Sequence, residues 1–445
     1  MKIIYLFLGL NLCLFLPSFG QNINTAKLDS FFNALDQNKR VMGSFAVVKD
    51  GKTVYTRSVG YSLKTPADSI LATATTKYRI GSISKVFTAT MVFQLIDEGK
   101  LSLDTKLNKY FPKLPNAERI TIGQLLTHSS GLMDYVNDVA DKNWITKPHS
   151  RAELLDTIAK RKVHFEPGAK QQYSNSGYLL LGYILEKITG KSYSKSLETR
   201  IINKIGLKNT SSSIPNNKGT DEARPYKFLN SWENVVDIYF PNVVGVGDIL
   251  STPTDMVTFI NALTSDKLIT KKSFLQMSNF KDKDVFAMGL IKVPFYEQTG
   301  LGHNGGTYGS YSVLYAFKDS GISFASCTNG LNYSLNDISI GILSISNNKP
   351  YQIPTFKVIV FKPEELEAYT GVYSNPTFPI KITITQEGQS LFGQGSGQQP
   401  FPFEAIAKDK FKFDGAGIVI EFNKEKQGMT FTQGGQNLQF TKEKK

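Results

Sequence analysis

The sequence predicts an α/β sandwich whose chain ends share one sheet, followed by a small antiparallel β-barrel. Two β-prone stretches with turn signals, residues 44–60 and 310–327, enclose a long middle part with helical periodicity, and a further helical stretch follows them. This order brings strands from both ends of the first unit into one sheet. From about residue 350 onward, short apolar strands alternate with turn residues, which is typical of a small antiparallel barrel.

The first strand pair is predicted by Phe45–Val48 and Val54–Thr56, which flank an Asp-Gly pair. Asp-Gly between β-prone runs is a strong signal for a tight hairpin. The apolar run after Ser82 predicts a buried helix that ends at Gly99. The same criteria predict helices at 121–131, 178–190 and 335–345, strands at 310–317 (opened by the glycine-rich segment 302–307) and 322–327, and barrel strands at 380–384, 401–403, 411–413, 418–422, 429–431 and 438–440.

Residues 1–20 are interpreted as a signal peptide. Lys2 supplies the positive charge, Ile3–Leu16 are almost wholly apolar, and Pro17–Gly20 offer a small-residue cleavage site. The apolar run is short for a membrane-spanning helix, and no later stretch is long and apolar enough to be an anchor. We therefore expect an exported protein, periplasmic or secreted, without a transmembrane anchor.

Composition divides the rest of the chain and narrows its partners. We expect a first domain at 21–349, a proline-containing linker at 350–363 and the barrel at 364–445. The formal net charge of +13 is spread along the chain, and no helix-turn-helix, zinc-finger or RNA-binding motif is found, so nucleic acid is not an expected partner. One cysteine remains beyond the signal peptide, so no intramolecular disulfide is expected.

The segment Arg79–Ala89 holds the first candidate for chemistry. Ser82 and Lys85 stand three positions apart at the start of an apolar helix, so Ser82 Oγ and Lys85 Nζ can meet on one face. Loss of hydration favours the neutral form of a buried lysine, which can then take the hydroxyl proton. The pattern alone is weak, because a helix start with a solvated lysine has the same letters. Three further Ser-x-x-Lys copies occur, at 192–195, 278–281 and 346–349.

Three short motifs follow one another in chain order: Ser82–Lys85, Tyr173–Asn175 and His303–Gly306. With several linking segments, they make residues 25–345 resemble the serine β-lactamase and penicillin-binding-protein superfamily. The branch that the chain resembles holds class C β-lactamases, D-alanyl-D-alanine carboxypeptidases and related esterases. The resemblance implies a β-lactamase/transpeptidase-like fold, with an antiparallel sheet, helices on both of its sides and a helical subdomain. The trailing barrel is expected to be lipocalin-like.

The resemblance also implies a role for each motif residue. Ser82 would attack a carbonyl carbon and form an acyl-enzyme, while Lys85 and Tyr173 would move protons between the nucleophile and the leaving group. The sequence leaves open which of these two is the general base. Asn175 would hydrogen-bond the amide of the substrate, and the backbone N–H groups of Ser82 and Gly306 would form the oxyanion hole.

The third motif departs from the lactamase pattern, which has Lys-Thr-Gly at this place. His303 replaces a permanent cation by a group that titrates near about pH 6.5, so we expect weaker or pH-dependent binding of substrate carboxylates. Gly305 and Gly306 would let substrate approach the strand closely. Asp248 also departs, because it stands where the family pattern usually has another glycine. His128 is expected to be structural, as a support for the turn that follows it.

Together these observations predict an exported serine hydrolase that forms an acyl-enzyme on Ser82. The expected activity is that of a DD-peptidase, carboxypeptidase, esterase or amidase on D-amino-acid peptides, including peptidoglycan stem peptides, or on small esters. The alternatives are a β-lactamase, against which His303 counts, and a non-catalytic penicillin-binding sensor or scaffold. No cofactor is expected, and no metal site is proposed because the remaining histidines lack metal-ligand spacing. Self-association through the barrel is a further expectation.

Overall fold

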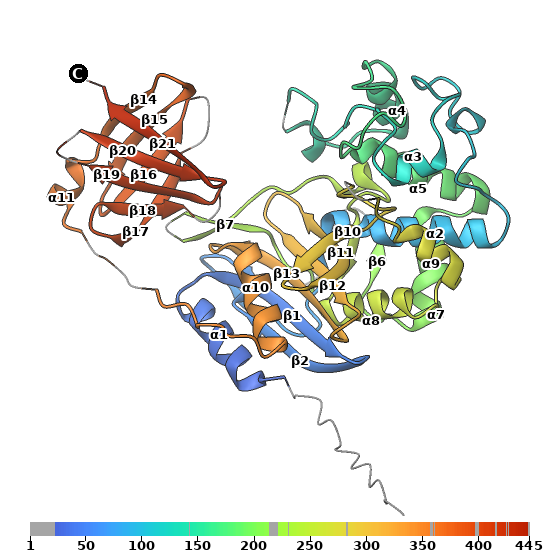
Figure 1. Cartoon of the computed structure of the whole chain (residues 1–445), viewed down its shortest axis with the longest axis horizontal. Helices are drawn as coiled ribbons and strands as arrows, with labels where there is room; N and C mark the ends of the chain where they lie inside the picture. Colours follow the sequence, from blue (N-terminus) through green and yellow to red (C-terminus); the bar gives the residue numbers. More distant parts are fainter. Residues whose placement is uncertain are drawn as a thin grey trace, which may run out of the picture.

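The computed structural model describes residues 23–141, 143–212, 221–229, 231–281, 284–356, 359, 361–396, 400–413, 416–423, 425 and 427–443. The predicted signal peptide at 1–20 lies outside these residues. Among the helices of the described ranges, none combines the length and apolarity that crossing a bilayer requires. Figure 1 shows a sheet with helices on both of its sides, a helical subdomain beside it and a separate barrel.

The central sheet joins strands from both ends of the first domain. Its main path, antiparallel throughout, runs β10 (Ile291–Phe295), β11 (Gln298–Gly306), β12 (Tyr311–Phe317), β13 (Ile322–Leu331), β1 (Val41–Lys49) and β2 (Lys52–Val59). β7 (Tyr226–Phe228) pairs with β13 in parallel and with β8 (Trp232–Asn234) in antiparallel orientation. Because Val41 lies opposite Leu331, the prediction that both chain ends share one sheet is confirmed.

The prediction for the glycine-rich segment 302–307 is wrong. Its residues up to Gly306 form the end of β11, rather than a lead-in to the strand at 310–317, and the β10–β11 hairpin was not predicted. Three glycines in five residues read locally as a turn. The strand exists because β12 pairs with it residue by residue, from Leu301 opposite Ala316 to Gly306 opposite Tyr311.

Side chains alternate between the two faces of the sheet, as the two-residue period of a strand requires. Along β1, Phe45 and Val47 point to one apolar cluster, while Ala46 and Val48 point to the other. The first face is covered by α1 (Thr25–Gln37) and α10 (Leu335–Ser346), and the second by α2 (Ser84–Asp97) and α8 (Pro253–Thr264) (Figure 1). The sheet is therefore the middle layer of a sandwich.

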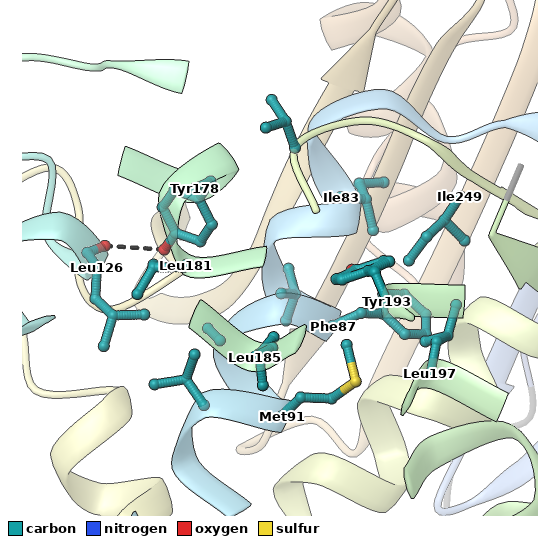
Figure 2. Close-up of a cluster of buried hydrophobic side chains, with 14 of the residues drawn as sticks. Ile83, Phe87, Met91, Leu126, Tyr178, Leu181, Leu185, Tyr193, Leu197 and Ile249 are labelled. Carbon is teal, nitrogen blue, oxygen red and sulfur yellow. Dashed lines mark hydrogen bonds between the residues drawn. The ribbon is translucent and has the colours of Figure 1, made fainter. Parts of the chain in front are cut away.

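The helical subdomain packs against α2. Figure 2 shows Ile83, Phe87 and Met91 facing apolar side chains of the subdomain helices at 175–189 and 193–197. A hydrogen bond of 2.9 Å from the Tyr178 hydroxyl to the Leu126 carbonyl joins the first of these helices to the one at 122–126. Its helices and the neighbouring ones are α3 (Ile122–Leu126), α4 (Arg151–Ala159), α5 (Asn175–Thr189), α6 (Tyr193–Leu197), α7 (Asn203–Ile205) and α9 (Lys271–Met277).

Two small sheets complete the first domain. β3 (Tyr61–Lys64) pairs with β4 (Ser69–Leu71). β9 (Ile249–Ser251) lies between β5 (Tyr78–Arg79) and β6 (Ser211–Ser212). The second of these sheets fixes the backbone that leads into the segment carrying Ser82, because β5 ends three residues before it.

The C-terminal unit is a closed antiparallel barrel, preceded by the short helix α11 (Pro363–Glu367). All six predicted barrel strands are present, and two more, β14 and β16, close the ring. The strands are β14 (Gly371–Asn375), β15 (Phe378–Glu387), β16 (Ser390–Gly395), β17 (Phe401–Ala407), β18 (Lys410–Phe413), β19 (Ile418–Asn423), β20 (Gly428–Gln433) and β21 (Gln436–Lys442).

An ion pair joins the barrel to the first domain. Arg40 directly precedes β1, and its two terminal nitrogens, Nη1 and Nη2, donate to the two carboxylate oxygens of Glu404 on β17. The Arg40 guanidinium also lies 4.3 Å from the ring centre of Phe356. The Phe356 ring in turn meets Tyr333 edge-on at 5.6 Å, so the contact includes the chain segment that leads to the barrel.

Candidate active site

Ser82 lies in a short 3-10 turn, Gly81–Ile83, that runs directly into α2. Gly81 has φ of +50°, and a Cβ there would come within 2.7 Å of the Gly306 nitrogen. A side chain at position 81 would thus push the end of β11 away from the serine. Ser82 itself is partly exposed, whereas Gly81 and Ile83 are buried, so its hydroxyl is accessible from solvent.

Lys85 lies on the first turn of α2 and is fully buried. It faces Ser82, as the i, i+3 spacing predicts. Its Nζ lies 2.9 Å from Ser82 Oγ and 3.0 Å from the carbonyl oxygen of Val246. Burial lowers the pKa of Lys85 to about 7, although the nearby Asp134 carboxylate opposes the shift. A substantial fraction of the amine is therefore neutral at physiological pH and can accept a proton.

Tyr173 approaches the same oxygen from the subdomain. Its hydroxyl donates to Ser82 Oγ at 2.7 Å, and its ring stacks on His128 with 4.4 Å between ring centres. Burial raises the pKa of Tyr173, with a smaller contribution from Asp134, and the hydrogen bond to Ser82 only partly opposes this. The phenol is therefore protonated at neutral pH and is a donor. The structure thus brings Ser82, Lys85 and Tyr173 together at one hydroxyl oxygen.

Asn175, two residues after Tyr173, is the first residue of α5, so this helix begins three residues before the predicted start at Tyr178. Its Nδ2 donates to both carboxylate oxygens of Asp134, at 3.1 and 2.9 Å. Because a carboxylate only accepts hydrogen bonds, Asn175 Oδ1 must point the other way. Asn175 can therefore offer an acceptor, but its donor group is already used.

Asp134 was missed by the sequence reasoning. It is buried, and besides Asn175 it accepts backbone N–H groups of Val136 and Asn137. This local pattern is an Asx turn, which is common outside active sites. Asp134 matters because it binds Asn175 and because its charge acts on Lys85, and both residues are distant in the sequence. The residues next to Asp134 in the sequence therefore do not reveal either interaction.

The end of β11 closes the site on the other side of Ser82. A Cβ on Gly305 would lie 2.0 Å from the carbonyl oxygen of Ile80 and 2.6 Å from Ser312 Oγ, so this position admits only glycine. Gly306 is exposed, and its backbone lies against Gly81. The predicted N–H groups of Ser82 and Gly306 therefore lie in neighbouring segments, as an oxyanion hole requires.

His303 is buried in β11 and does not behave as a cation. Its Nδ1 lies 2.5 Å from the carbonyl oxygen of Asn304, so the proton is on Nδ1 and the neutral ring offers Nε2 as an acceptor. Burial, with a smaller contribution from Lys85, lowers the pKa of His303 to about 4, and the bond to Asn304 only partly opposes this shift. At neutral pH the position that carries lysine in the lactamase pattern is therefore uncharged here.

His128 supports Tyr173 as well as its own turn. It has φ of +55°, an uncommon conformation for a residue other than glycine. Its Nδ1 lies 3.2 Å from both the nitrogen and the oxygen of Ser174, and its ring stacks on Tyr173. Burial and the Lys85 charge hold the pKa of His128 well below its ordinary value.

Two other Ser-x-x-Lys copies, at 192–195 and 278–281, have ordinary structural roles. Ser192 caps α6 by accepting the Lys195 backbone N–H at 3.2 Å, and Lys195 is exposed and pairs with Glu198. Ser278 follows the end of α9. Burial of the lysine thus separates the pair at Ser82 from the copy at Ser192. Within the described ranges, no three His, Cys, Asp or Glu side chains converge as a metal site would need.

Comparison with known proteins identifies the family of the chain. The Beta-lactamase family model matches residues 28–339. A teichoic acid D-alanine hydrolase of Staphylococcus aureus (strain NCTC 8325 / PS 47) is 26% identical over 357 residues, which cover 74% of this chain and 84% of that protein. The D-amino acid amidase of Ochrobactrum anthropi SV3, solved with L-phenylalanine amide, is 25% identical and gives a TM-score of 0.63 over 72% of this chain and 99% of that chain.

A solved structure that spans both units is also similar. The octameric penicillin-binding protein homologue of Pyrococcus abyssi is 23% identical, with a TM-score of 0.64 over 94% of this chain and 100% of that chain. This likeness concerns the fold, and its extent means that it includes the barrel. The family match covers most of the sandwich and includes all three motifs. The chain therefore belongs to the beta-lactamase family and is a serine hydrolase.

Proposed function

We propose that the chain hydrolyses esters or amides of D-amino acids, small peptides included, through an acyl-enzyme on Ser82. The observation that carries the proposal is the arrangement at one oxygen: Ser82 Oγ lies 2.9 Å from Lys85 Nζ and 2.7 Å from the Tyr173 hydroxyl. A serine hydroxyl needs such a partner before it is nucleophilic. Only these two side chains of the motif set lie within hydrogen-bond distance of that oxygen among the described residues.

In the proposed acylation step, the neutral amine of Lys85 takes the Ser82 proton. The oxygen then forms a bond to the substrate carbonyl carbon, and the negative charge moves to the carbonyl oxygen. The backbone N–H groups of Ser82 and Gly306 would stabilise that charge, and one such donor is worth about 2.7–4 kcal/mol. The lowered pKa of Lys85 supports its role as the base, because a base works well when its pKa is close to the working pH.

Tyr173 is proposed as the proton donor to the leaving group. Its raised pKa keeps it protonated at neutral pH, which suits an acid better than a base. As the bond from the carbonyl carbon to the leaving group breaks, Tyr173 gives its proton to the departing oxygen or nitrogen and recovers one from the Lys85 ammonium. Water then attacks the acyl carbon and gives a proton to the neutral amine of Lys85. The bond from that carbon to Ser82 Oγ breaks, and the Lys85 ammonium returns the proton to the oxygen, which restores Ser82 and releases the acid.

The substrate class follows from the charges around the serine. With His303 neutral, there is no cation at the place where a lactamase carries lysine, so peptide C-termini and β-lactams, which bear a carboxylate, lose that contact. Asn175 offers an acceptor, which suits an N–H group of the substrate. The named activities of the Staphylococcus and Ochrobactrum relatives, on D-alanine of teichoic acid and on D-amino acid amides, support the same class.

The decisive experiment labels the purified mature chain with a fluorophosphonate and measures turnover of D- and L-alanine esters and amides, a D-alanyl-D-alanine peptide and nitrocefin. We expect labelling and turnover of the D-esters or D-amides, both lost in Ser82→Ala and both kept in Ser192→Ala, which alters another Ser-x-x-Lys copy. Labelling that survives Ser82→Ala contradicts the nucleophile. Nitrocefin turnover faster than ester turnover would point to the β-lactamase alternative instead.

Export and self-association belong to the same proposal. We infer that residues 1–20 are removed on export, and mass spectrometry of the mature protein should then find Gln21 at its N-terminus. An intact Met1 in protein from the native cell envelope would contradict this. Self-association through the barrel predicts that the full chain is larger in light scattering than a monomer, and that a chain ending near residue 350 is monomeric.

A further inference from the structure

The turn that precedes β9 is closed by a buried carboxylate. Asp248 is fully buried, and its Oδ1 accepts the Gly245 N–H at 2.8 Å, while its Oδ2 accepts the Ser212 hydroxyl at 2.5 Å. Asp248 therefore ties the turn at 245–248 both to itself and to strand β6. A glycine here, as the family pattern has it, would leave the buried N–H of Gly245 without this acceptor.

The same turn presents two successive carbonyl groups to α2. The Gly245 oxygen accepts the Thr88 hydroxyl at 2.7 Å, and the Val246 oxygen accepts Lys85 Nζ at 3.0 Å. Positions 85 and 88 are one helical turn apart, so the turn lies along one face of the helix. Val246 thus supplies, with Ser82, one of the two oxygens that hold the Lys85 amine.

The turn at 245–248 packs closely against α5 and against the segment that carries Ser82. Gly245 has φ of +74°, and a Cβ there would come within 3.2 Å of the Gly182 Cα atom on α5. Gly247 packs on the other side, where a Cβ would lie 3.6 Å from Gly81. Figure 2 shows Tyr193 and Ile249 beside Ile83, which precedes α2, and Phe87 of α2. The position of the Val246 oxygen therefore depends on how the turn is closed.

Electrostatics agrees with a carboxylate at this place. Burial raises the pKa of Asp248 to about 6, with its hydrogen bonds and Arg79 acting in the opposite direction, so the group is ionised at neutral pH. The groups that face Asp248 are Arg79, Tyr135 and Tyr193. Those that face Lys85 are Asp134, Tyr173, Tyr178, His128 and His303.

We propose that Asp248 is a positioning residue for acylation: its carboxylate closes the 245–248 turn and so holds the Val246 carbonyl oxygen against the Lys85 amine. The inference rests on the proposed function, because the position of Lys85 matters only if Lys85 serves Ser82. Asp248 touches no reacting atom. It acts through the backbone that binds the base.

The test measures the rate of Ser82 labelling by a fluorophosphonate from pH 5 to pH 9, per active site, in wild type and Asp248→Ala. We expect the plateau rate to fall at least 10-fold. The acid limb should shift to lower pH, because loss of the Val246 oxygen disfavours the ammonium form of Lys85. With an ester substrate, kcat should fall and KM should change little. Asp248→Asn keeps an acceptor for Gly245 and should recover at least a third of the wild-type rate.

Asp255→Ala is the matched control. Asp255 is also a buried carboxylate that accepts a backbone N–H, from Asn209 at 2.7 Å, and a hydroxyl, from Thr210 at 2.8 Å, but neither partner belongs to the 245–248 turn that holds Lys85. It should lower Tm and leave the labelling rate and its acid limb unchanged. If Asp248→Ala does not fold, Asp248→Ser, which is too short to reach both partners, gives the same comparison.

The outcomes separate the two proposals. Normal labelling of the wild type together with an unchanged rate and acid limb in Asp248→Ala overturns the role of Asp248 and leaves the proposed function standing. Absence of labelling at Ser82 in the folded wild type overturns both. Loss of rate in Asp248→Ala that Asp248→Asn does not recover also contradicts the proposal, because it assigns the effect to charge rather than to the closed turn.

Discussion

The interior around Ser82 and the interior of the barrel are built in opposite ways. Near the serine, Lys85, His128, Asp134, Asp248 and His303 are all buried. Among the described residues from 361 onward, by contrast, no charged, amide, histidine, serine or threonine side chain is in the buried class, and the core consists of aromatic and aliphatic groups. One interior contains groups that titrate near neutral pH, and the other contains none.

The difference shows which interior lowers the folding stability, because charged and histidine side chains are buried around Ser82 but not among the described residues of the barrel. Removing an ionisable group from water disfavours its charged form and costs folding free energy, which only packing elsewhere can offset. The barrel core, with rings such as Phe361, Tyr369, Phe411 and Phe422 in mutual contact, contributes without such losses. We therefore expect changes near Ser82 to alter rates at little cost in stability, and changes in the barrel to do the reverse.

The largest expected effect is that of Lys85→Met. Loss of the proposed base should lower the rate of Ser82 labelling about 10³-fold, while Tm at pH 7 rises because a buried amine is removed. The lowered pKa of Lys85 means that the unfolded chain binds more protons between pH 7 and about 10.5. Wild-type stability should thus rise with pH above 7, and Lys85→Met should lack this slope. Urea unfolding from pH 7 to 9.5 measures this slope in wild type and in Lys85→Met.

A matched change in the barrel should have the opposite signature. Phe411→Ala removes a ring that contacts Phe361, Tyr369 and Phe422 and should cost about 3–5 kcal/mol of barrel stability. The labelling rate of Ser82 at 20 °C should stay within twofold of wild type. Calorimetry should show a lowered transition for the barrel. A labelling rate that falls together with that transition would break the proposed division between the two interiors.

The contact between the two units is the next test. Glu404→Arg places two cations together at a half-buried site and should loosen the docked barrel by about 1–3 kcal/mol. X-ray scattering should show a larger radius of gyration, and the double variant Arg40→Glu/Glu404→Arg should restore the wild-type value. The control is Lys410→Glu, which breaks the exposed ion pair with Glu421 between two barrel strands and should leave the radius of gyration unchanged. An unchanged radius in Glu404→Arg would show that this ion pair does not hold the units together.

The smallest expected effect concerns His303. Its pKa is lowered from about 6.5 to about 4, so the unfolded chain binds the extra proton between these values, and folding stability falls as the pH decreases through this window. His303→Gln should remove roughly 2 kcal/mol of the loss between pH 6.5 and pH 5. Urea unfolding at these two values measures it. An identical slope in wild type and variant would mean that His303 is protonated in the folded chain.

The sequence predicts those parts of the molecule that depend on local spacing. The Asp50-Gly51 hairpin has the positive φ values, 49° and 77°, that its turn type requires, and the i, i+3 spacing of Ser82 and Lys85 is enough to bring them together. β11 could not be predicted, because its glycine-rich end is a strand only through β12. A glycine at 305 is needed because Ile80, far away in the sequence, approaches it.

The same distinction holds for the candidate site. Residue types and order point to Ser82, Tyr173 and His303, but the charge of His303 depends on burial by distant segments, and so does the lowered pKa of Lys85. Asp134 escaped notice because it looks locally like a turn residue, and Asp248 was noted only as a departure from the glycine of the family pattern. Their partners, Asn175 and Ser212, come from other parts of the chain.

The pairing of β1 with β13 determines when the catalytic centre can exist during synthesis. Val41 meets Leu331 only after almost the whole first domain has left the ribosome, and β11 with Gly305 and Gly306 is also made late. Until then β1 has β2 on one side and an unpaired edge on the other, which is an opportunity for association between nascent chains. A chain that stops before residue 302 would carry Ser82, Lys85 and Tyr173 but would lack the segment that supplies Gly305 and Gly306 to the proposed site.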